Sequence, residues 1–92
     1  MKYLQIHLVQ GKELLLTSGN VVFAGESFRF VARDLEGDVS LVVYDAKGNV
    51  VHSAVAQREF EVSTVGYSAG IYFYMATDAA GFKKTGKLLV KG

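Results

Sequence analysis

Short strand-like segments separated by glycine-containing turns run along the whole chain, and this pattern limits the fold more than any other feature. The segments recur about every eight to twelve residues, which is typical of an antiparallel sandwich. No window of about ten residues has the 3.6-residue periodicity of an amphipathic helix. The 92 residues are therefore predicted to form one all-β domain over residues 1–92, an antiparallel β-sandwich of about seven to eight strands.

Alternation of polar and apolar residues locates the expected strands. It is clearest over residues 27–33, where Phe28 is expected to face the core and Arg29 the solvent. Residues 39–44 and 70–77 are almost entirely apolar, so both faces of these two strands are expected to be covered. The other expected strands are residues 2–9, 14–16, 21–24, 50–55, 59–62 and 82–91, the last of them broken at Gly86.

Composition and charge remove several classes of function. The hydrophobic content of 50% excludes an intrinsically disordered chain, and the absence of cysteine excludes disulfides and thiolate chemistry. The net charge of +1 argues against binding to nucleic acid or to an anionic membrane surface. No apolar run is long enough for a membrane-spanning helix. The charge is unevenly distributed along the chain, because four of the ten basic residues are lysines within residues 83–92.

The sequence GFKKTGKL at residues 81–88 nearly matches the consensus of a phosphate-binding loop. Such a loop needs Ser or Thr after its lysine to reach Mg²⁺, and it opens a helix whose N-terminus faces the phosphates. Leu88 occupies the Ser/Thr position and begins an apolar run at the end of the chain. Nucleotide binding is therefore not expected.

The remaining chemically active side chains do not form a catalytic or metal-binding motif. His7 and His52 lie in separate expected strands, and an enzyme would need a pocket that collects one of them with carboxylates. The aspartates lie in or beside turns, where a carboxylate can bond its own backbone, and no calcium-loop pattern is present. We predict no enzyme activity, no catalytic residue, no cofactor and no metal.

Three tyrosines provide a different kind of candidate. Tyr67, Tyr72 and Tyr74 could stack against sugar rings or against a partner protein. Because both faces of the expected strand over residues 70–77 are apolar, packing of these rings in the core is the favoured interpretation. Binding of carbohydrate or protein by an accessory or adhesion domain stays open as the alternative function.

Three motifs in the second half of the chain occur in an order and spacing that resemble a known family. A strand ending in Tyr44 and Asp45 leads through Gly48 to a β-branched pair, and Gly70 and Tyr72 later open an aromatic strand. The chain closes with a lysine-rich apolar strand made of Lys87, Leu88, Leu89, Val90 and Lys91. Over residues 40–92 the sequence resembles the type A C-terminal sorting domain of the type IX secretion system of Bacteroidetes.

The resemblance implies an immunoglobulin-like sandwich that directs a passenger protein through the outer membrane to the cell surface or the medium. It also implies that the outer-membrane translocon and a sortase-like peptidase are the partners, and that the motif residues named above are the recognition residues. The terminal strand, at a sheet edge, would be the part that the secretion machinery recognises. We further expect that residues 1–92 are part of a longer exported protein.

Overall fold

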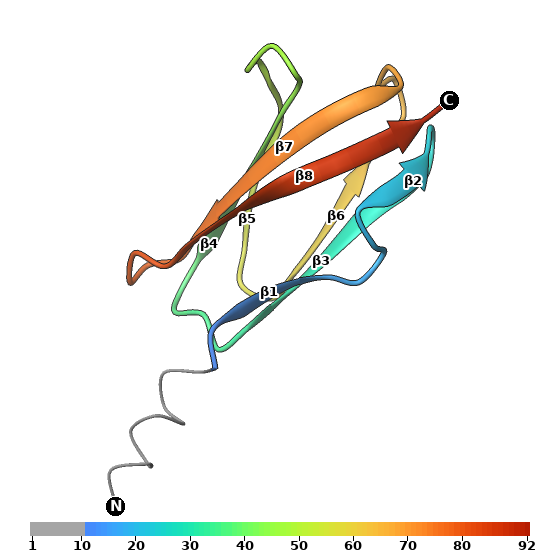
Figure 1. Cartoon of the computed structure of the whole chain (residues 1–92). Helices are drawn as coiled ribbons and strands as arrows, with labels where there is room; N and C mark the ends of the chain where they lie inside the picture. Colours follow the sequence, from blue (N-terminus) through green and yellow to red (C-terminus); the bar gives the residue numbers. More distant parts are fainter. Residues whose placement is uncertain (1–10) are drawn as a thin grey trace, which may run out of the picture.

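Eight strands make up the computed structural model, which describes residues 11–92 (Figure 1). The strand expected at residues 2–9 and the side chain of His7 lie outside the described residues. The strands are β1 (Glu13–Leu16), β2 (Val21–Phe23), β3 (Ser27–Arg33), β4 (Val39–Tyr44), β5 (Val50–Ala56), β6 (Glu59–Ser63), β7 (Gly70–Thr77) and β8 (Lys83–Lys91). Within this range no helix has the length and apolarity needed to cross a bilayer.

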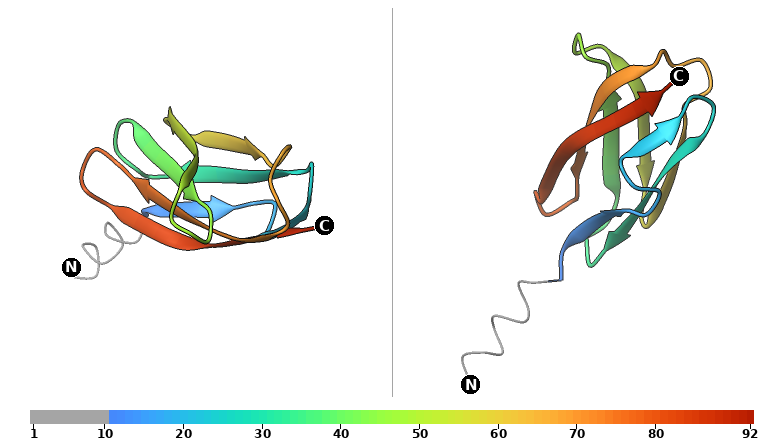
Figure 2. Two further views of the ribbon diagram at one scale, coloured as in Figure 1. Left: turned by 90° about the horizontal axis from the view of Figure 1, so that it is seen from above. Right: turned by 45° about the vertical axis from the view of Figure 1, so that its right-hand side comes forward.

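The strands form two sheets that lie face to face (Figure 2). One sheet has three strands in the order β1-β3-β6, and the other has five in the order β2-β8-β7-β4-β5. The predicted all-β sandwich of seven to eight strands is confirmed. All pairings are antiparallel, as expected, except that of β2 with β8, which is parallel and which no sequence pattern predicted.

The N-terminal part of the sandwich changes sheets between β1 and β2. β1 pairs with β3, and after the turn at residues 17–20 the chain crosses to the five-stranded sheet, where β2 pairs with the end of β8. The backbone N–H of Leu89 donates to the carbonyl of Asn20, and that of Ala24 donates to the carbonyl of Lys91. Two packed sheets, with the first two described strands divided between them, agree with the immunoglobulin-like sandwich that the resemblance implies.

The core lies between the two inner faces. Alternation in β3 buries Phe28 and Phe30 and leaves Arg29 and Arg33 exposed, as predicted. Four strands of the five-stranded sheet, β2, β4, β7 and β8, contribute buried residues to the same core, and β5 contributes only the partly buried Ala54 and Ala56. The buried residues of this sheet are Val22, Val39, Leu41, Val43, Tyr72, Tyr74, Ala76, Leu88 and Val90.

The prediction that β4 and β7 are covered on both faces is wrong. On β7, Ile71 is 48% and Phe73 38% exposed, and on β4 Ser40 is exposed. The two strands are central within their sheet, but no second layer covers its outer face among the described residues. Position in the middle of a sheet protects the backbone groups of a strand, whereas only a second layer protects both sets of side chains.

The break expected at Gly86 is also wrong, because β8 runs without interruption from Lys83 to Lys91. Gly86 lies opposite Tyr74 on β7, and a Cβ atom at Gly86 would approach the Tyr74 ring to 2.6 Å. The ring also packs edge-on against Phe30, with 5.1 Å between ring centroids. Gly86 thus makes room for the buried Tyr74 ring. The ring in turn covers the backbone of β8 at Gly86, which has no side chain of its own.

Candidate recognition site

The three sequence motifs meet at one end of the sandwich, which we call the C-terminal pole. It consists of the β4–β5 turn (residues 45–49), the loop before β7 (residues 64–69) and the chain end (residues 90–92) (Figure 1). A groove of about 340 Å³ lies between the turn and the loop. At the chain end, a Cβ atom on Gly92 would lie 3.4 Å from that of Ala69. Motifs that are well separated in sequence therefore become neighbours.

The Tyr44–Gly48 motif forms the β4–β5 turn. The Asp45 carboxylate accepts hydrogen bonds from the backbone N–H groups of Lys47 and Asn49, at 2.9 and 2.8 Å, and from the side-chain amide of Asn49. These bonds, led by the one from the Asn49 backbone, hold the pKa of Asp45 below its usual range. Gly48 has a φ of +89°, which favours glycine at this position. Asp45 and Gly48 thus shape the hairpin.

The Gly70–Tyr72 motif fixes the start of β7. Gly70 has a φ of +150° and open space where a Cβ would be, so it is the backbone conformation that requires glycine. The Tyr72 hydroxyl donates a 2.7 Å hydrogen bond to the carbonyl of Ser68, four residues earlier. A tyrosine at the start of the corresponding strand makes the same kind of bond in immunoglobulin domains. This motif therefore ties the loop to the core.

Alternation divides the terminal motif on β8 into two sets. Leu88 and Val90 are each 1% exposed and point into the core. Lys87, Leu89 and Lys91 point to the outer face of the sheet, with the two lysines exposed and Leu89 half-buried. Only the outward set is accessible to a partner protein.

The expectation that β8 lies at a sheet edge holds for only part of the strand. β2 covers the backbone edge of Leu89, Val90 and Lys91, whereas no strand among the described residues pairs with the same edge of residues 83–88. The end of the chain is thus held within the sheet, and its outward side chains remain available.

Charge is distributed unequally between the two sheets. Glu13, Glu59 and Glu61 lie on the three-stranded sheet with two arginines, and Arg29 and Arg33 pair with Glu61 and Glu13 at 3.2 and 3.7 Å. The five strands of the other sheet contain no Asp or Glu, and the four lysines on β8 make no ion pair within residues 11–92. The positive charge of this sheet is therefore uncompensated.

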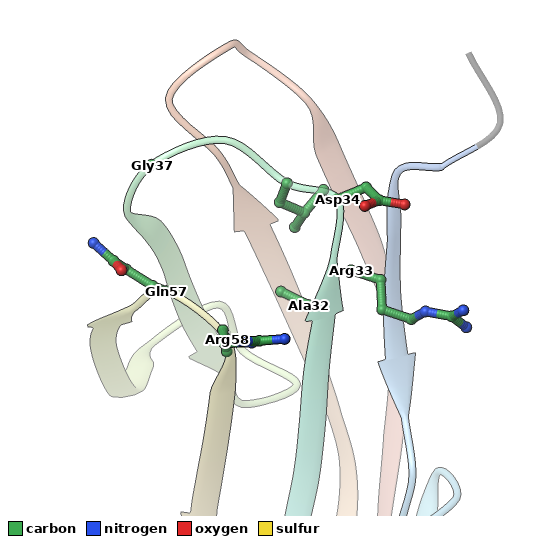
Figure 3. Close-up of a pocket in the computed structure, with 7 residues that line it drawn as sticks. Ala32, Arg33, Asp34, Gly37, Gln57 and Arg58 are labelled. Carbon is green, nitrogen blue, oxygen red and sulfur yellow. The ribbon is translucent and has the colours of Figure 1, made fainter. Parts of the chain in front are cut away.

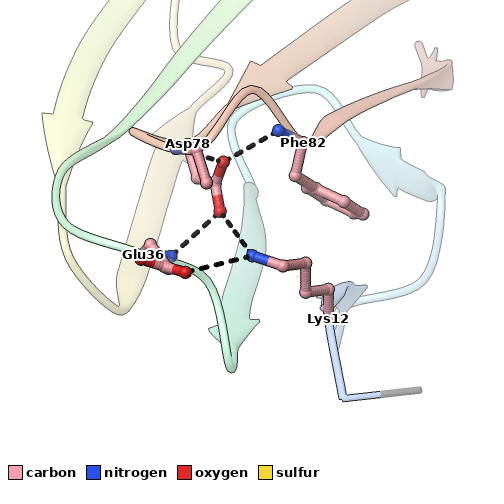
Figure 4. A network of polar contacts seen from close by, with 5 residues as sticks. Lys12, Glu36, Asp78 and Phe82 are labelled. Atoms are coloured by element: carbon pink, nitrogen blue, oxygen red, sulfur yellow. Dashed lines mark hydrogen bonds and ion pairs between the residues drawn. The ribbon is translucent and has the colours of Figure 1, made fainter. Parts of the chain in front are cut away.

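At the opposite end of the sandwich, Asp78 joins three segments (Figure 4). Its buried carboxylate accepts hydrogen bonds from the backbone N–H groups of Glu36, Ala80 and Phe82, at 2.8 to 2.9 Å, and the Lys12 ammonium lies 3.2 Å away. The Glu36 N–H, followed by the Phe82, Lys12 and Ala80 donors, lowers the pKa of Asp78 to about 2 despite burial. The position of Asp78 at a turn indicated its local bonds, but nothing in the sequence indicated Lys12.

A shallow pocket of about 340 Å³ lies at this same end, beside the β3–β4 loop (Figure 3). Arg33, Asp34, Gln57 and Arg58 line it, and the Arg33 guanidinium pairs with Glu13. His52 lies on β5, half-buried, and is not among the lining residues. Within residues 11–92, no three His, Cys, Asp or Glu side chains gather in a group that could hold a metal ion.

Residues 81–88, which nearly match the consensus of a phosphate-binding loop, form the end of the β7–β8 turn and the first part of β8. The segment is extended and opens no helix, so its backbone N–H groups are not arranged around an anion. Its glycines have structural roles: Gly81 has a φ of +91° in the turn, and Gly86 accommodates the Tyr74 ring.

The three tyrosines considered for ligand stacking do not form an exposed platform. Tyr72 and Tyr74 are each 6% exposed, which confirms that they pack in the core. Tyr67 stacks on Tyr72 with 5.0 Å between ring centroids and packs against the same core. Burial raises the pKa of both Tyr67 and Tyr74. Nothing supports the alternative of an adhesion domain that binds through these rings.

Comparison with known protein families decides the assignment. A family model described as the secretion system C-terminal sorting domain matches residues 26–91. The chain belongs to this family. The match begins just before β3 and extends through β8, so it reaches further toward the N-terminus than the resemblance over residues 40–92. A search of the curated proteins finds no significant match.

As a member of the sorting-domain family, the chain is a C-terminal sorting signal for type IX secretion, the export route of Bacteroidetes. It directs the protein that carries it to the cell surface or into the medium. It therefore interacts with the type IX secretion machinery. The outer face of β8 and the C-terminal pole therefore belong to a domain that the secretion machinery recognises.

Proposed function

We propose that the sorting domain is a non-catalytic module that the outer-membrane translocon reads through the outward side chains of β8, Lys87, Leu89 and Lys91. The observation that carries this proposal is the division of the terminal motif: Leu88 and Val90 are buried, whereas the three alternate residues point to solvent. A partner can contact only what is exposed in the folded domain. Leu88 and Val90 keep the strand in place, so that the other three residues are presented in a fixed spacing.

In this proposal the first two motifs act indirectly. Asp45 and Gly48 shape the turn, and Gly70 and Tyr72 anchor the loop before β7, so both motifs fix the geometry of the C-terminal pole. The recognised unit is the whole domain, residues 1–92, with β1 and β2 included. After export, a sortase-like peptidase removes the domain from its passenger.

Export of a reporter tests the proposal. A fluorescent protein with a signal peptide and residues 1–92 at its C-terminus is expressed in a type IX-competent host, and the exported fraction is compared between variants. Lys87→Glu, Leu89→Asp and Lys91→Glu combined are expected to lower the exported fraction at least about tenfold. The two lysines are exposed, so their substitutions cost little stability, whereas Leu89 is half-buried, so the urea midpoint of the purified triple variant is measured alongside export. The matched control, Arg29→Glu with Glu61→Arg, exchanges the charges of an exposed ion pair on the other sheet.

Each outcome has one interpretation. Unchanged export of the triple variant would overturn the proposed recognition residues, and retention of the wild-type reporter in the periplasm would contradict the sorting function itself. Leu88→Ala is expected to reduce export by a different route, since loss of a buried leucine costs about 2–5 kcal/mol of stability. Loss of the domain's mass from the exported reporter tests the cleavage step.

A further inference from the structure

A band of exposed apolar side chains crosses the outer face of the five-stranded sheet. Val21, Phe23, Ile71 and Phe73 are 45, 58, 48 and 38% exposed. Strand register makes them neighbours: Val21 lies beside Leu89 and Leu89 beside Ile71, while Phe73 lies two residues further along the same face of β7. The band thus spans three strands, β2, β8 and β7. Exposed apolar side chains that are contiguous, unlike scattered ones, mark an interaction surface.

A groove of about 450 Å³ continues this band. Its walls are side chains on the outer face of β4, β7 and β8, and its floor is the backbone at Tyr74 and Gly86. The wall residues are Tyr44, Phe73, Met75, Thr85 and Lys87. Most of the lining is apolar, and Lys87 contributes the only charged group. The groove therefore suits an apolar side chain with a carboxylate beside it.

The charges around the band restrict the partner further. Lys87 lies directly beside Phe73, and Lys91 beside Phe23, in the register of the sheet. No Asp or Glu occurs in the five strands, and neither lysine has an ion-pair partner within residues 11–92. A second copy of this face would bring lysines against lysines, which disfavours self-association through it. An acidic surface would neutralise them.

From these observations we infer that the outer face of the five-stranded sheet is the docking surface for an acidic protein partner. The partner presents carboxylates to Lys87 and Lys91 and an apolar side chain to the groove beside Phe73. This inference rests on the proposed function, since the partner is a component of the type IX machinery. It enlarges the recognised surface from one strand to a face built by β2, β8, β7 and β4.

Substitutions on β7 test this surface separately from β8. Phe73→Asp places a carboxylate beside Lys87, where the partner's carboxylates would lie, and it is expected to lower the export rate of the reporter at least fivefold, while the purified domain still unfolds cooperatively in urea because the ring is only partly buried. The matched control is Val55→Asp, which introduces the same charge at a 64% exposed valine on β5, at the other end of the sheet. It is expected to be exported like the wild type. Phe73→Ser replaces the aspartate variant if that variant does not fold.

Zero-length cross-linking identifies the chemistry of the partner. Carbodiimide treatment of outer-membrane fractions is expected to join Lys87 or Lys91 to an Asp or Glu of an export component, and the cross-link is expected to disappear in Phe73→Asp. Cross-links confined to a second copy of the domain would overturn the inference. So would Phe73-dependent binding of the purified domain to phosphatidylglycerol vesicles, which would assign the face to lipid.

The two proposals fail in different ways. If the wild-type reporter is not exported, the sorting function fails. If the triple variant of β8 loses export and Phe73→Asp is exported at the wild-type rate, the docking surface fails while recognition through β8 stands.

Discussion

Two aspartates at opposite ends of the sandwich organise the turns beside them by the same chemistry. Asp45 accepts two backbone N–H groups within its own hairpin, whereas Asp78 accepts three, one of them from the distant β3–β4 loop. Hydrogen bonds to a carboxylate are stronger than bonds between neutral groups and favour its charged form. At the residue scale, single carboxylates thus do much to position the loops.

The stability of the domain is expected to depend on the ionisation of Asp78. Its pKa is about 2 in the folded domain, against an ordinary value of 3.8. Because the folded-state pKa is depressed, its contribution is complete above about pH 4 and is lost as the pH falls toward about 2. Asp78→Asn is expected to be less stable at neutral pH, and the difference from the wild type should shrink in this window.

Urea unfolding at several pH values between about 7 and 2.5 measures this dependence. Asp38→Asn is the control for removing one negative charge, because Asp38 is exposed and accepts a single bond, from Gln57. A constant difference between Asp78→Asn and the wild type across the whole range would contradict the assigned role.

At the scale of elements, the β7–β8 pair carries most of the proposed recognition surface and part of the core. Alternation sends Tyr72 and Tyr74 inward and Ile71 and Phe73 outward, and β8 follows the same rule. The loop before β7 is held by the Tyr72 hydroxyl, whereas the neighbouring Tyr67 hydroxyl is buried with no partner among the described residues. The two stacked tyrosines therefore differ in whether the hydroxyl group has a hydrogen-bond partner.

This difference leads to a prediction for paired variants. Tyr72→Phe removes the 2.7 Å bond to Ser68 and is expected to lower the free energy of unfolding by about 1–2 kcal/mol. Tyr67→Phe removes a buried hydroxyl without a partner, so it is expected to leave the free energy unchanged or to raise it by up to about 1 kcal/mol. Urea denaturation of the two variants checks both values. Equal losses would show that the Ser68 bond does not anchor the loop.

At the scale of the whole molecule, β1 and β2 complete the sandwich although the family match begins after them, at residue 26. Leu14 on β1 and Val22 on β2 are 3 and 6% exposed, so each of the two sheets gains one core residue from these strands. β1 covers one edge of β3, and β2 covers the edge of β8 at its C-terminal end. Both strands therefore support the surface that the later strands build.

A shortened chain of residues 26–92 is expected to be much less stable than the full chain. Loss of Leu14 and Val22 removes about 1.5–3 kcal/mol each, and the pairings of two strands are lost as well. Small domains are stable by only about 5–15 kcal/mol, so this loss is a large fraction. Newly exposed edges also favour aggregation. Urea denaturation and size-exclusion chromatography compare the two chains, and identical midpoints would contradict a structural role for β1 and β2.

Sequence alone determined the features that depend on near neighbours. The positions of the described strands followed from alternation and from two apolar runs, the β4–β5 turn from Asp45 and Gly48, and the family from motifs in the second half of the chain. Steric preferences and local hydrogen bonds act over a few residues, so they can be inferred from the residue types that neighbour one another in a single sequence.

The tertiary structure decided which surfaces are covered and which distant groups meet. Alternation shows that Ile71 and Phe73 share a face, but not that no second layer covers it. The parallel pairing of β2 with β8 and the contact of Lys12 with Asp78, 66 residues apart, depend on the path of the whole chain. Burial is a property of the packed molecule, so only the assembled sheets separate the residues that build the domain from those that a partner can read.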